Sequence, residues 1–527
     1  MKQPDLSSLV PPAEWMQRDS ESEQTVPWSF VMTITAFAAV LRLYAISSQS
    51  LWIDELLTWQ AIQPGGELRF LEQFLDTIQG PLYLALAWPL INWQDTELMM
   101  RLPAALAGII TVPLFGVLAI RLVDRRAAFL ATLLMAMNPF HIWYSQEARG
   151  YAFLILWSVV AGLFYANMVR RRPTWGQAVG FGVAAGFMVL SNMSGVFLLV
   201  AMALTLVVFH RPQSLVRAHW WWVLGFGLAT LIAAPWLLKA SGIWAVDRIV
   251  PGAATGMSLR GDTTFSPLAV PYSLFTFYFG YSFGPSLREL HNPDRLGVLL
   301  SYWPLLVAGA ISVGLALAPL CKRLNRHQGA LIMWVLVPVA LLAILALRNI
   351  KPWNPRYIAV VLPWVILLTG IGLSRWRRRG GFIVSSVLVG LTMWSLVGYF
   401  NNDSYVKADI RSAVSEVAES GLNGEPVLVP SVTAVYKYYD RGAHPLISSY
   451  GLPPLANRAA AEVYVKKMLP KSGRTWVVLA REWYFDPYDL LVPALSQRGH
   501  LQTHMDVPGV RIYTWSSNED GESTDGR

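Results

Sequence analysis

The stretch SLWIDELLT, residues 50–58, places two adjacent carboxylates, Asp54 and Glu55, directly after the first long apolar run of the chain. Trp52 and several aliphatic residues flank the pair. A carboxylate next to hydrocarbon is costly to keep charged, so in a membrane protein it usually marks a functional site. The alternative is that both residues are merely solvated at a helix end. Other features of the sequence distinguish between these two interpretations.

The composition indicates a polytopic membrane protein. Of 527 residues, 54% are hydrophobic and only 14% are charged, whereas ordinary soluble domains have about 25% charged residues. The net charge of +9 resides in short basic clusters between apolar runs, which is typical of membrane topology and not of nucleic-acid binding. The single cysteine, Cys321, excludes an internal disulfide.

Eleven apolar runs are long enough to span a bilayer, which takes about 17 to 25 residues. Residues 1–27 are polar, and we expect the first run to be an uncleaved signal anchor and not a cleaved signal peptide. The predicted fold is therefore α-helical, with about eleven transmembrane helices. The runs lie near residues 28–48, 102–120, 127–143, 151–169, 174–190, 193–209, 218–238, 298–320, 328–347, 357–374 and 381–400.

Five short connections predict the orientation of these helices. They hold fifteen Lys and Arg in 26 residues, and such residues stay preferentially on the cytoplasmic side. All five alternate with the other connections if the N-terminus is cytoplasmic. The loops 49–101 and 239–297 and everything after residue 400 then face the outside. The five basic connections are residues 121–126, 170–172, 211–217, 322–326 and 375–379.

Three segments of the outer loops are predicted to lie at the interface. Pro81–Asn92 is apolar but only 12 residues long, roughly 18 Å as a helix, so it is interpreted as a half-helix outside the ~30 Å hydrocarbon core. If it did span, the N-terminus and Asp54 would lie on opposite faces. Glu67–Asp76 is an amphipathic helix candidate, and residues 266–283 are aromatic and interrupted by Pro and Gly.

Beyond residue 400 the composition becomes that of a soluble domain. We predict an extracytoplasmic α/β domain over residues 401–515, ending in a tail, 516–527, that is too polar to pack. The predicted strands are Pro426–Pro430, Trp476–Ala480 and Val510–Trp515, and the predicted helices are Asn457–Leu469 and Asp489–Arg498.

Several polar residues gather on the predicted outer face, where the positive-inside rule should deplete cations. Taken singly, each cation is commonly a snorkelling side chain. Together they suit a lipid-linked phosphate, which Arg binds through paired hydrogen bonds. The candidate substrate-binding residues are Glu147, Arg149, Tyr151, Lys239, Lys351, Arg356 and Tyr357.

This combination suggests glycosyl transfer. A carboxylate at the membrane surface can act as general base on a hydroxyl acceptor, while cations stabilise a departing phosphate. The chain has no G-x-x-x-x-G-K-[ST] loop and no H-E-x-x-H motif, and a nucleotide cofactor is not expected. A divalent metal at Asp54, Glu55 or Glu147 stays open.

The order of five short motifs resembles the GT-C superfamily of integral membrane glycosyltransferases. Over residues 28–400 the chain is similar to bacterial relatives of the dolichyl-phosphate-mannose protein mannosyltransferases and of the lipid A aminoarabinose transferases. The motifs are SLWIDELLTW, GPLY (residues 80–83), ELMMRLPAALAG (97–108), NPFHIWYSQEARGY (138–151) and PRY (355–357).

The resemblance implies an inverting transfer from a polyprenyl-phosphate sugar, with Asp54 as catalytic base and Glu55 as its neighbour. It also implies that Glu147 and Arg149 lie near donor or acceptor, and that the donor phosphate approaches Arg356 and Tyr357. The chain departs from the pattern at Gln79-Gly80-Pro81, where many relatives have His-Pro-Pro. A role for a histidine there is not carried over.

Two other functions compete with this interpretation. A transporter or flippase for an anionic lipid-linked substrate would use the same cations, but it usually has ionisable groups or broken helices in the middle of several spans. A catalytically silent member would bind a cell-wall polymer through its C-terminal domain. The expected partners are a polyprenyl-phosphate-linked sugar, membrane lipid and a hydroxyl acceptor on protein, lipid or polysaccharide, in the plasma membrane.

Overall fold

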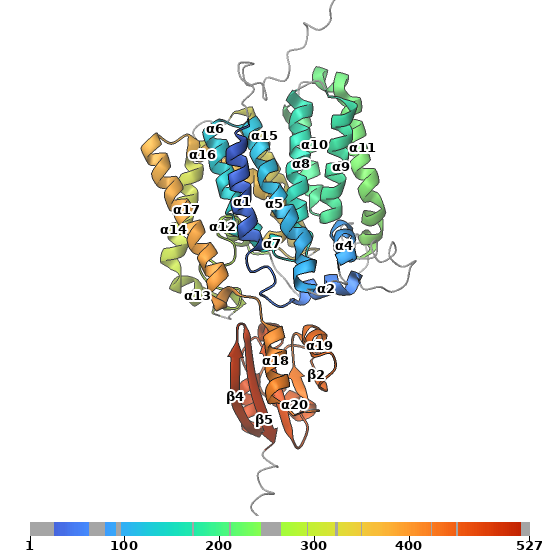
Figure 1. The fold of residues 1–527 in the computed structure, drawn as a ribbon, viewed down its shortest axis with the longest axis vertical. Coiled ribbons are helices and arrows are strands. Elements are labelled where there is room, and N and C mark those ends of the chain that lie inside the picture. Colours follow the sequence, from blue (N-terminus) through green and yellow to red (C-terminus); the bar gives the residue numbers. More distant parts are fainter. Residues whose placement is uncertain are drawn as a thin grey trace, which may run out of the picture. The chain divides into compact units, whose positions relative to one another are not determined.

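The structure is a computed structural model of a mainly helical protein with one small sheet (Figure 1). It divides into two units. The first unit comprises Met1–Tyr44, Thr58–Gly280 and Ala308–Met393, and the second comprises Ala45–Leu57, Tyr281–Val307 and Trp394–Arg527. The structure describes residues 26–62, 79–90, 96–170, 173–209, 212–243, 265–291, 294–321, 325–348, 350–422, 424–449 and 452–517.

The first unit consists of helices. Among its members, α8, α9, α10 and α11 run side by side (Figure 1). The elements are α1 (Trp28–Leu43), the end of α2 (Ile53–Ile62), α4 (Pro81–Ala87), η2 (Trp88–Leu90), α5 (Thr96–Leu122), α6 (Arg125–Ala136), α7 (Pro139–Ser145), α8 (Tyr151–Arg170), α9 (Trp175–Ser191), α10 (Gly195–Phe209), α11 (Pro212–Ile243), α12 (Ala269–Phe279), most of α14 (Trp303–Leu317), η5 (Ala318–Cys321), α15 (Arg326–Leu347), η6 (Pro355–Val361), α16 (Leu362–Ser374) and most of α17 (Arg378–Asn401).

Ten of the eleven predicted spans correspond to apolar helices. Seven described helices are long and apolar enough to cross a membrane, and α1, α9 and α10 are shorter apolar helices of 15 to 17 residues. The segment Pro81–Leu90 forms only α4 and a 3-10 turn, as expected of a half-helix. The candidate helix Glu67–Asp76 lies outside the described residues.

The one remaining predicted span, residues 127–143, is not a single helix, so the prediction of a span there is wrong. It is divided into α6 and α7. Pro139 stands at the first position of α7, where its missing N–H costs nothing, and the Asn138 side chain accepts a hydrogen bond from the His141 N–H at 2.8 Å. A residue before proline is driven away from helical geometry, so the helix breaks at Asn138.

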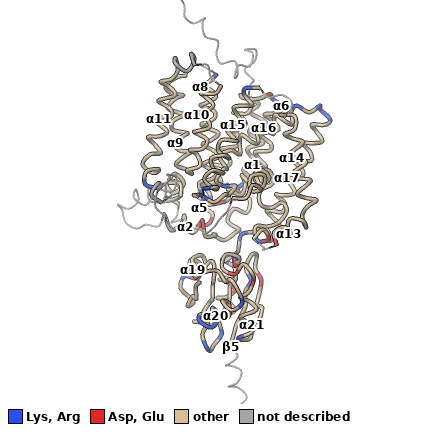
Figure 2. The backbone as a smooth tube through the Cα atoms, turned by 180° about the vertical axis from the view of Figure 1, so that it is seen from behind, with Lys and Arg blue, Asp and Glu red and all other residues tan. Residues whose placement is uncertain are grey.

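Three of the five predicted basic connections meet at one end of the first unit. Arg126 donates to the carbonyl oxygens of Ser374 at 3.3 Å and Trp376 at 3.2 Å. Arg170 donates to the carbonyl oxygen of Arg121, and Arg375 donates to that of Pro319 at 3.1 Å. Figure 2 shows the charged residues of the helices mainly near helix ends.

The opposite end of the same helices brings two predicted motifs together at the end of α9. Gly80, before α4, and Gly150, before α8, both lie against the backbone of Ser191 at the end of α9. A Cβ atom added at either glycine would overlap the carbonyl oxygen of Ser191. Since α8 is 20 residues long, this end lies roughly 30 Å from Arg170. The glycines of two predicted motifs are therefore required for close packing.

The second unit contains the sheet, whose strand order is β2-β1-β3-β5-β4. Strand β1 pairs in parallel with β2 and β3, and β5 is antiparallel to β3 and β4. The elements are the start of α2, η4 (Glu289–His291), α13 (Arg295–Ser301), η7 (Asp403–Tyr405), α18 (Ile410–Ser420), β1 (Val427–Val429), α19 (Thr433–Asp440), β2 (Leu446–Ser448), α20 (Arg458–Met468), β3 (Arg474–Ala480), η8 (Glu482–Tyr484), α21 (Leu491–Arg498), β4 (Gly499–Val507) and β5 (Val510–Ser517).

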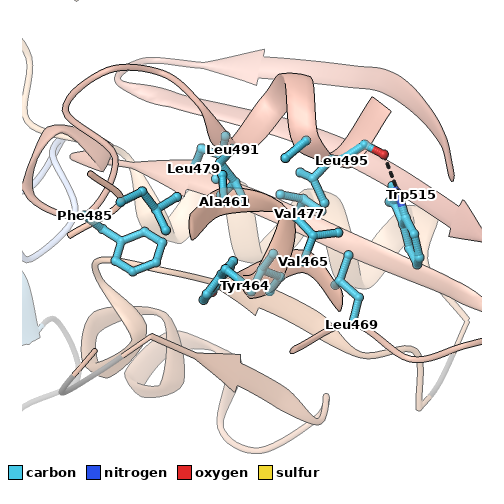
Figure 3. Packing of buried hydrophobic residues seen from close by; sticks show 13 residues of the cluster. Ala461, Tyr464, Val465, Leu469, Val477, Leu479, Phe485, Leu491, Leu495 and Trp515 are labelled. Carbon is cyan, nitrogen blue, oxygen red and sulfur yellow. Dashed lines mark hydrogen bonds between the residues drawn. The ribbon is translucent and has the colours of Figure 1, made fainter. Parts of the chain in front are cut away.

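The core of this domain lies where α20 and α21 pack against the sheet (Figure 3). Val465, Val477 and Leu495 are at most 2% exposed. The Trp515 ring covers one side of this core, and its Nε1 donates a hydrogen bond to the carbonyl oxygen of Leu495 at 3.0 Å. All five elements predicted after residue 400 are present, while β2, β4, α18 and α19 were not predicted.

We expect the two valines of α20 to respond differently to truncation. Val465 is 2% exposed, whereas Val463 is 64% exposed. Val465→Ala should lower the free energy of opening of the domain by roughly 2 kcal/mol because it removes buried methyl groups and leaves a cavity. Val463→Ala should leave it nearly unchanged. Amide hydrogen exchange of β3 in the full chain measures the difference, and equal exchange in both variants would contradict the packing.

We expect Gly80→Ala and Gly150→Ala each to destabilise the helical unit, because the added Cβ atom would overlap the carbonyl oxygen of Ser191. Overpacking of this kind costs roughly 1–3 kcal/mol, which should lower the unfolding midpoint of the purified protein in detergent. The control is Gly176→Ala in α9, where an added Cβ meets nothing within 4 Å. Its midpoint should stay unchanged or rise slightly, and a similar loss at all three positions would refute the steric explanation.

Candidate functional site

The acidic pair lies in the first turn of α2, where carboxylates are favoured by the helix dipole. The two residues have different surroundings. Glu55 is fully buried, with Oε2 3.4 Å from the N–H of Trp52 and 3.9 Å from Nζ of Lys407. Asp54 is only partly buried. Glu55 is therefore buried within the second unit, whereas Asp54 is accessible to solvent.

Two cations of the C-terminal domain lie over the ring of Trp52. Lys407 Nζ is 5.2 Å from the ring centroid, and Arg481 Cζ is 5.4 Å from it. Contacts of this kind are attractive because the face of an indole ring is electronegative. Sequence reasoning missed both cations, since they lie more than 350 residues beyond Trp52 in the chain and no local pattern links them to it.

The predicted motifs of the first unit are joined to one another. Thr58 donates to the side-chain oxygen of Gln79 at 2.7 Å, and Tyr83 donates to the carbonyl oxygen of Met100. The Tyr83 ring also packs edge-on against Phe153, with centroids 6.0 Å apart. Gln79 therefore acts as a hydrogen-bond acceptor at the position where many relatives have histidine.

The turn before α8 presents Glu147 and Arg149. Glu147 is 1% exposed and accepts a hydrogen bond from Nε1 of Trp143 at 3.0 Å, while Arg149 is partly buried. Tyr151 is 2% exposed, and its ring packs edge-on against Tyr144 with centroids 4.9 Å apart. The surroundings of Tyr151 show a packing role for its ring, and its predicted contact with substrate stays a prediction.

The segment before η6 gathers two cations around one aromatic ring. Lys351 Nζ is 4.3 Å and Arg356 Cζ is 5.3 Å from the centroid of Tyr357. Two cations on one ring repel each other, and a bound anion would reduce this repulsion. Nε1 of Trp353 anchors the segment to α12 by donating to Ser273 Oγ at 2.8 Å. The geometry suits a phosphate.

Lys239 is exposed near the end of α11.

The predicted site residues are divided between the two units. Asp54 and Glu55 belong to the second unit, whereas Glu147, Arg149, Tyr151, Lys239, Lys351, Arg356 and Tyr357 belong to the first.

A buried cation within α1 was also missed. Arg42 is fully buried, and its guanidinium donates to the carbonyl oxygen of Ala136 at 2.8 Å and lies 2.8 Å from Nδ1 of His141. The last carbonyls of a helix lack backbone partners and attract cations, so Arg42 caps α6 where the helix breaks. The sequence did contain a signal for this residue, because Arg42 is a charged side chain inside the predicted span 28–48.

Within the part of the chain that the structure describes, no three His, Cys, Asp or Glu side chains form a group that could hold a metal ion. The second unit supplies a carboxylate that can remove a proton from a hydroxyl group, and the first unit supplies cations that can bind an anionic group.

Comparison with known proteins relates part of the sequence to one family. The sequence model of the dolichyl-phosphate-mannose-protein mannosyltransferase family matches residues 79–238. This range includes Glu147 and Arg149 but not Asp54. No curated protein sequence matches the chain.

Two crystal structures of ArnT from Cupriavidus metallidurans are similar to nearly the whole chain. The apo structure has a TM-score of 0.53 at 14% identity and covers 92% of this chain and 98% of ArnT. The structure of ArnT bound to undecaprenyl phosphate has a TM-score of 0.51 at 14% identity and covers 93% and 98%. The chain therefore has the fold of the GT-C superfamily of integral membrane glycosyltransferases and, over residues 79–238, matches its dolichyl-phosphate-mannose-protein mannosyltransferase family.

Proposed function

We propose that the chain transfers a sugar from a polyprenyl-phosphate donor to a hydroxyl group of a protein, lipid or polysaccharide, with inversion at the anomeric carbon. The reaction takes place at the outer face of the plasma membrane, with the N-terminus in the cytoplasm. The observation that carries this proposal is the likeness of the fold to that of ArnT, which has been crystallised bound to undecaprenyl phosphate, together with the partly exposed acidic residue Asp54.

Asp54 is the catalytic base in this proposal. It takes the proton of the acceptor hydroxyl group, whose oxygen attacks the anomeric carbon from the face opposite the phosphate. The bond from that carbon to the phosphate oxygen breaks, and the electron pair leaves with polyprenyl phosphate. Glu55 is a poorer candidate, because it is fully buried with the ammonium group of Lys407 3.9 Å away.

The leaving phosphate gains a second negative charge, which nearby cations offset. We assign this role to Lys351 and Arg356, because both already lie at the ring of Tyr357. Arg149 and Lys239 are further cations for the donor. Glu147 and Tyr151 belong to the same proposed binding region, where the buried carboxylate of Glu147 is oriented by Trp143.

Asp54→Asn should lower turnover by about 100- to 10,000-fold, because the amide cannot accept the proton. The assay uses the purified chain in vesicles with labelled undecaprenyl-phosphate-linked mannose, arabinose or aminoarabinose. Membranes from a strain lacking the chain supply the acceptor, and mass spectrometry measures the released undecaprenyl phosphate.

The matched control is Asp403→Asn, because Asp403 is an exposed carboxylate of the second unit. Its turnover should equal that of the wild-type protein. Near wild-type turnover in the Asp54→Asn protein would remove Asp54 from the mechanism. Movement of the labelled lipid across the vesicle membrane without release of undecaprenyl phosphate would instead favour a transporter.

Lys351→Met and Arg356→Met should each weaken binding of undecaprenyl phosphate about tenfold or more. A hydrogen bond to a charged group contributes about 1.5–3 kcal/mol, and about 1.4 kcal/mol corresponds to a tenfold change in affinity. Arg348→Met is the control, because Arg348 is an exposed cation of the same segment. Titration of the purified protein with undecaprenyl phosphate measures the dissociation constants. Equal affinities in all three variants would exclude this phosphate site.

A further inference from the structure

The loop that leads into α2 is bound through its backbone and side chains by the C-terminal domain. Ser50 Oγ donates to the carbonyl oxygen of Ala408 at 3.0 Å and accepts from the N–H of Ile410 at 3.1 Å. The N–H of Leu51 donates to the hydroxyl group of Tyr439 at 2.7 Å. Three hydrogen bonds therefore fix the chain just before the acidic pair.

The start of the same loop has its own anchor. Arg411 Nη2 donates to the carbonyl oxygen of Ser48 at 2.7 Å, and the N–H of Lys407 is 3.4 Å from the side-chain oxygen of Gln49. Backbone groups of a loop are usually satisfied by water when no protein group covers them. Here the segment 407–411 supplies the partners, so the position of the loop depends on the domain.

Lys407 and Arg481 extend this attachment to the first turn of α2. Both lie over the ring of Trp52, and Lys407 Nζ is also 3.9 Å from the carboxylate of Glu55. The Lys407 side chain is only 11% exposed and that of Glu55 is fully buried. A buried carboxylate requires a nearby cation because the protein interior solvates charge poorly. The pair therefore holds α2 in place at the residue next to Asp54.

The backbone at Arg481 is adapted to this contact. Its φ of 51° lies in the left-handed region, which residues other than glycine seldom adopt and which often accompanies a functional constraint. The next residue, Glu482, accepts from Arg288 at 2.9 Å and from Arg511 at 3.0 Å. Trp483 stacks on His291, with ring centroids 5.1 Å apart.

We propose that Lys407 and Arg481 are positioning residues that hold Asp54 in its reactive place, and that the C-terminal domain is therefore part of the transfer machinery. The proposal rests on the proposed function of Asp54. A general base acts only within about 2.6–3.2 Å of its proton, and a misplacement of about 1 Å can cost about 100-fold in rate. Releasing Trp52 and Glu55 frees the turn that carries Asp54.

The test uses Lys407→Met and Arg481→Met in the full chain, which keep most of the side-chain volume and remove the charge. Each should lower kcat at least tenfold in the undecaprenyl-phosphate-sugar assay, while KM for the lipid donor changes less than twofold. Hydrogen exchange in peptides covering residues 47–57 should become at least tenfold faster, while exchange in β3 and β5 stays as in the wild-type protein.

The control is Arg474→Met, which removes a comparable contact elsewhere in the domain, since Arg474 Cζ lies 4.7 Å from the ring centroid of Trp476. It should change neither kcat nor exchange in the loop. Lys407→Arg keeps the positive charge and should recover at least half of the wild-type kcat. If Lys407→Arg is as slow as Lys407→Met, or if Lys407→Met changes neither kcat nor loop exchange, the proposal is wrong.

The two proposals fail in different ways. If Asp54→Asn retains turnover, the proposed function of Asp54 fails, whatever the variants of Lys407 and Arg481 do. If Asp54→Asn is inactive while Lys407→Met and Arg481→Met keep wild-type kcat, only the positioning role fails. Faster exchange throughout β3 and β5 in both Met variants, with kcat not restored by Lys407→Arg, would mean that these residues maintain the domain fold and would also overturn the positioning role.

Discussion

The buried carboxylate of Glu55 is the constraint on which the second unit depends. A charge removed from water needs a cation close by, and the ammonium group of Lys407 lies 3.9 Å away. Lys407 can reach it only if the segment before α18 lies along the loop 47–52. The hydrogen bonds of Ser50 and Arg411 hold that segment there. A local electrostatic requirement thus explains why a loop from the N-terminal part belongs to the same unit as the sheet.

The first unit is governed by a steric constraint. The carbonyl oxygen of Ser191 is approached by Gly80 and Gly150, and neither position has space for a side chain. The same type of packing joins α9 to α11, where Gly182 and Gly186 meet Leu228 and Ile232. Without a hydrophobic driving force between helices in lipid, small residues allow the close contacts that hold them together. The motif residues Gly80 and Gly150 therefore serve close helix packing.

Local patterns in the sequence predicted most of the elements, whereas features that depend on tertiary contacts were missed. The length of the apolar runs located the helices, and short strand-like runs located β1, β3 and β5. Strand β4 was not predicted because it is an edge strand with mostly exposed residues. Strand β2 was not predicted because it has only three residues. The break at Asn138 was signalled by the next residue, a proline, but not recognised. Lys407 and Arg481 could not be assigned, because no periodicity relates them to Trp52.

The attachment of the loop to the domain also defines which parts of such a chain can be exchanged. A cut near residue 400 looks like a natural boundary, because the composition changes there. The structural unit is discontinuous, however, and includes residues 45–57 and 281–307. A hybrid made by joining the helices of one relative to the soluble domain of another would lose the partners of Ser50, Trp52 and Glu55. Recombination between relatives should therefore succeed only when the loop and the domain are inherited together.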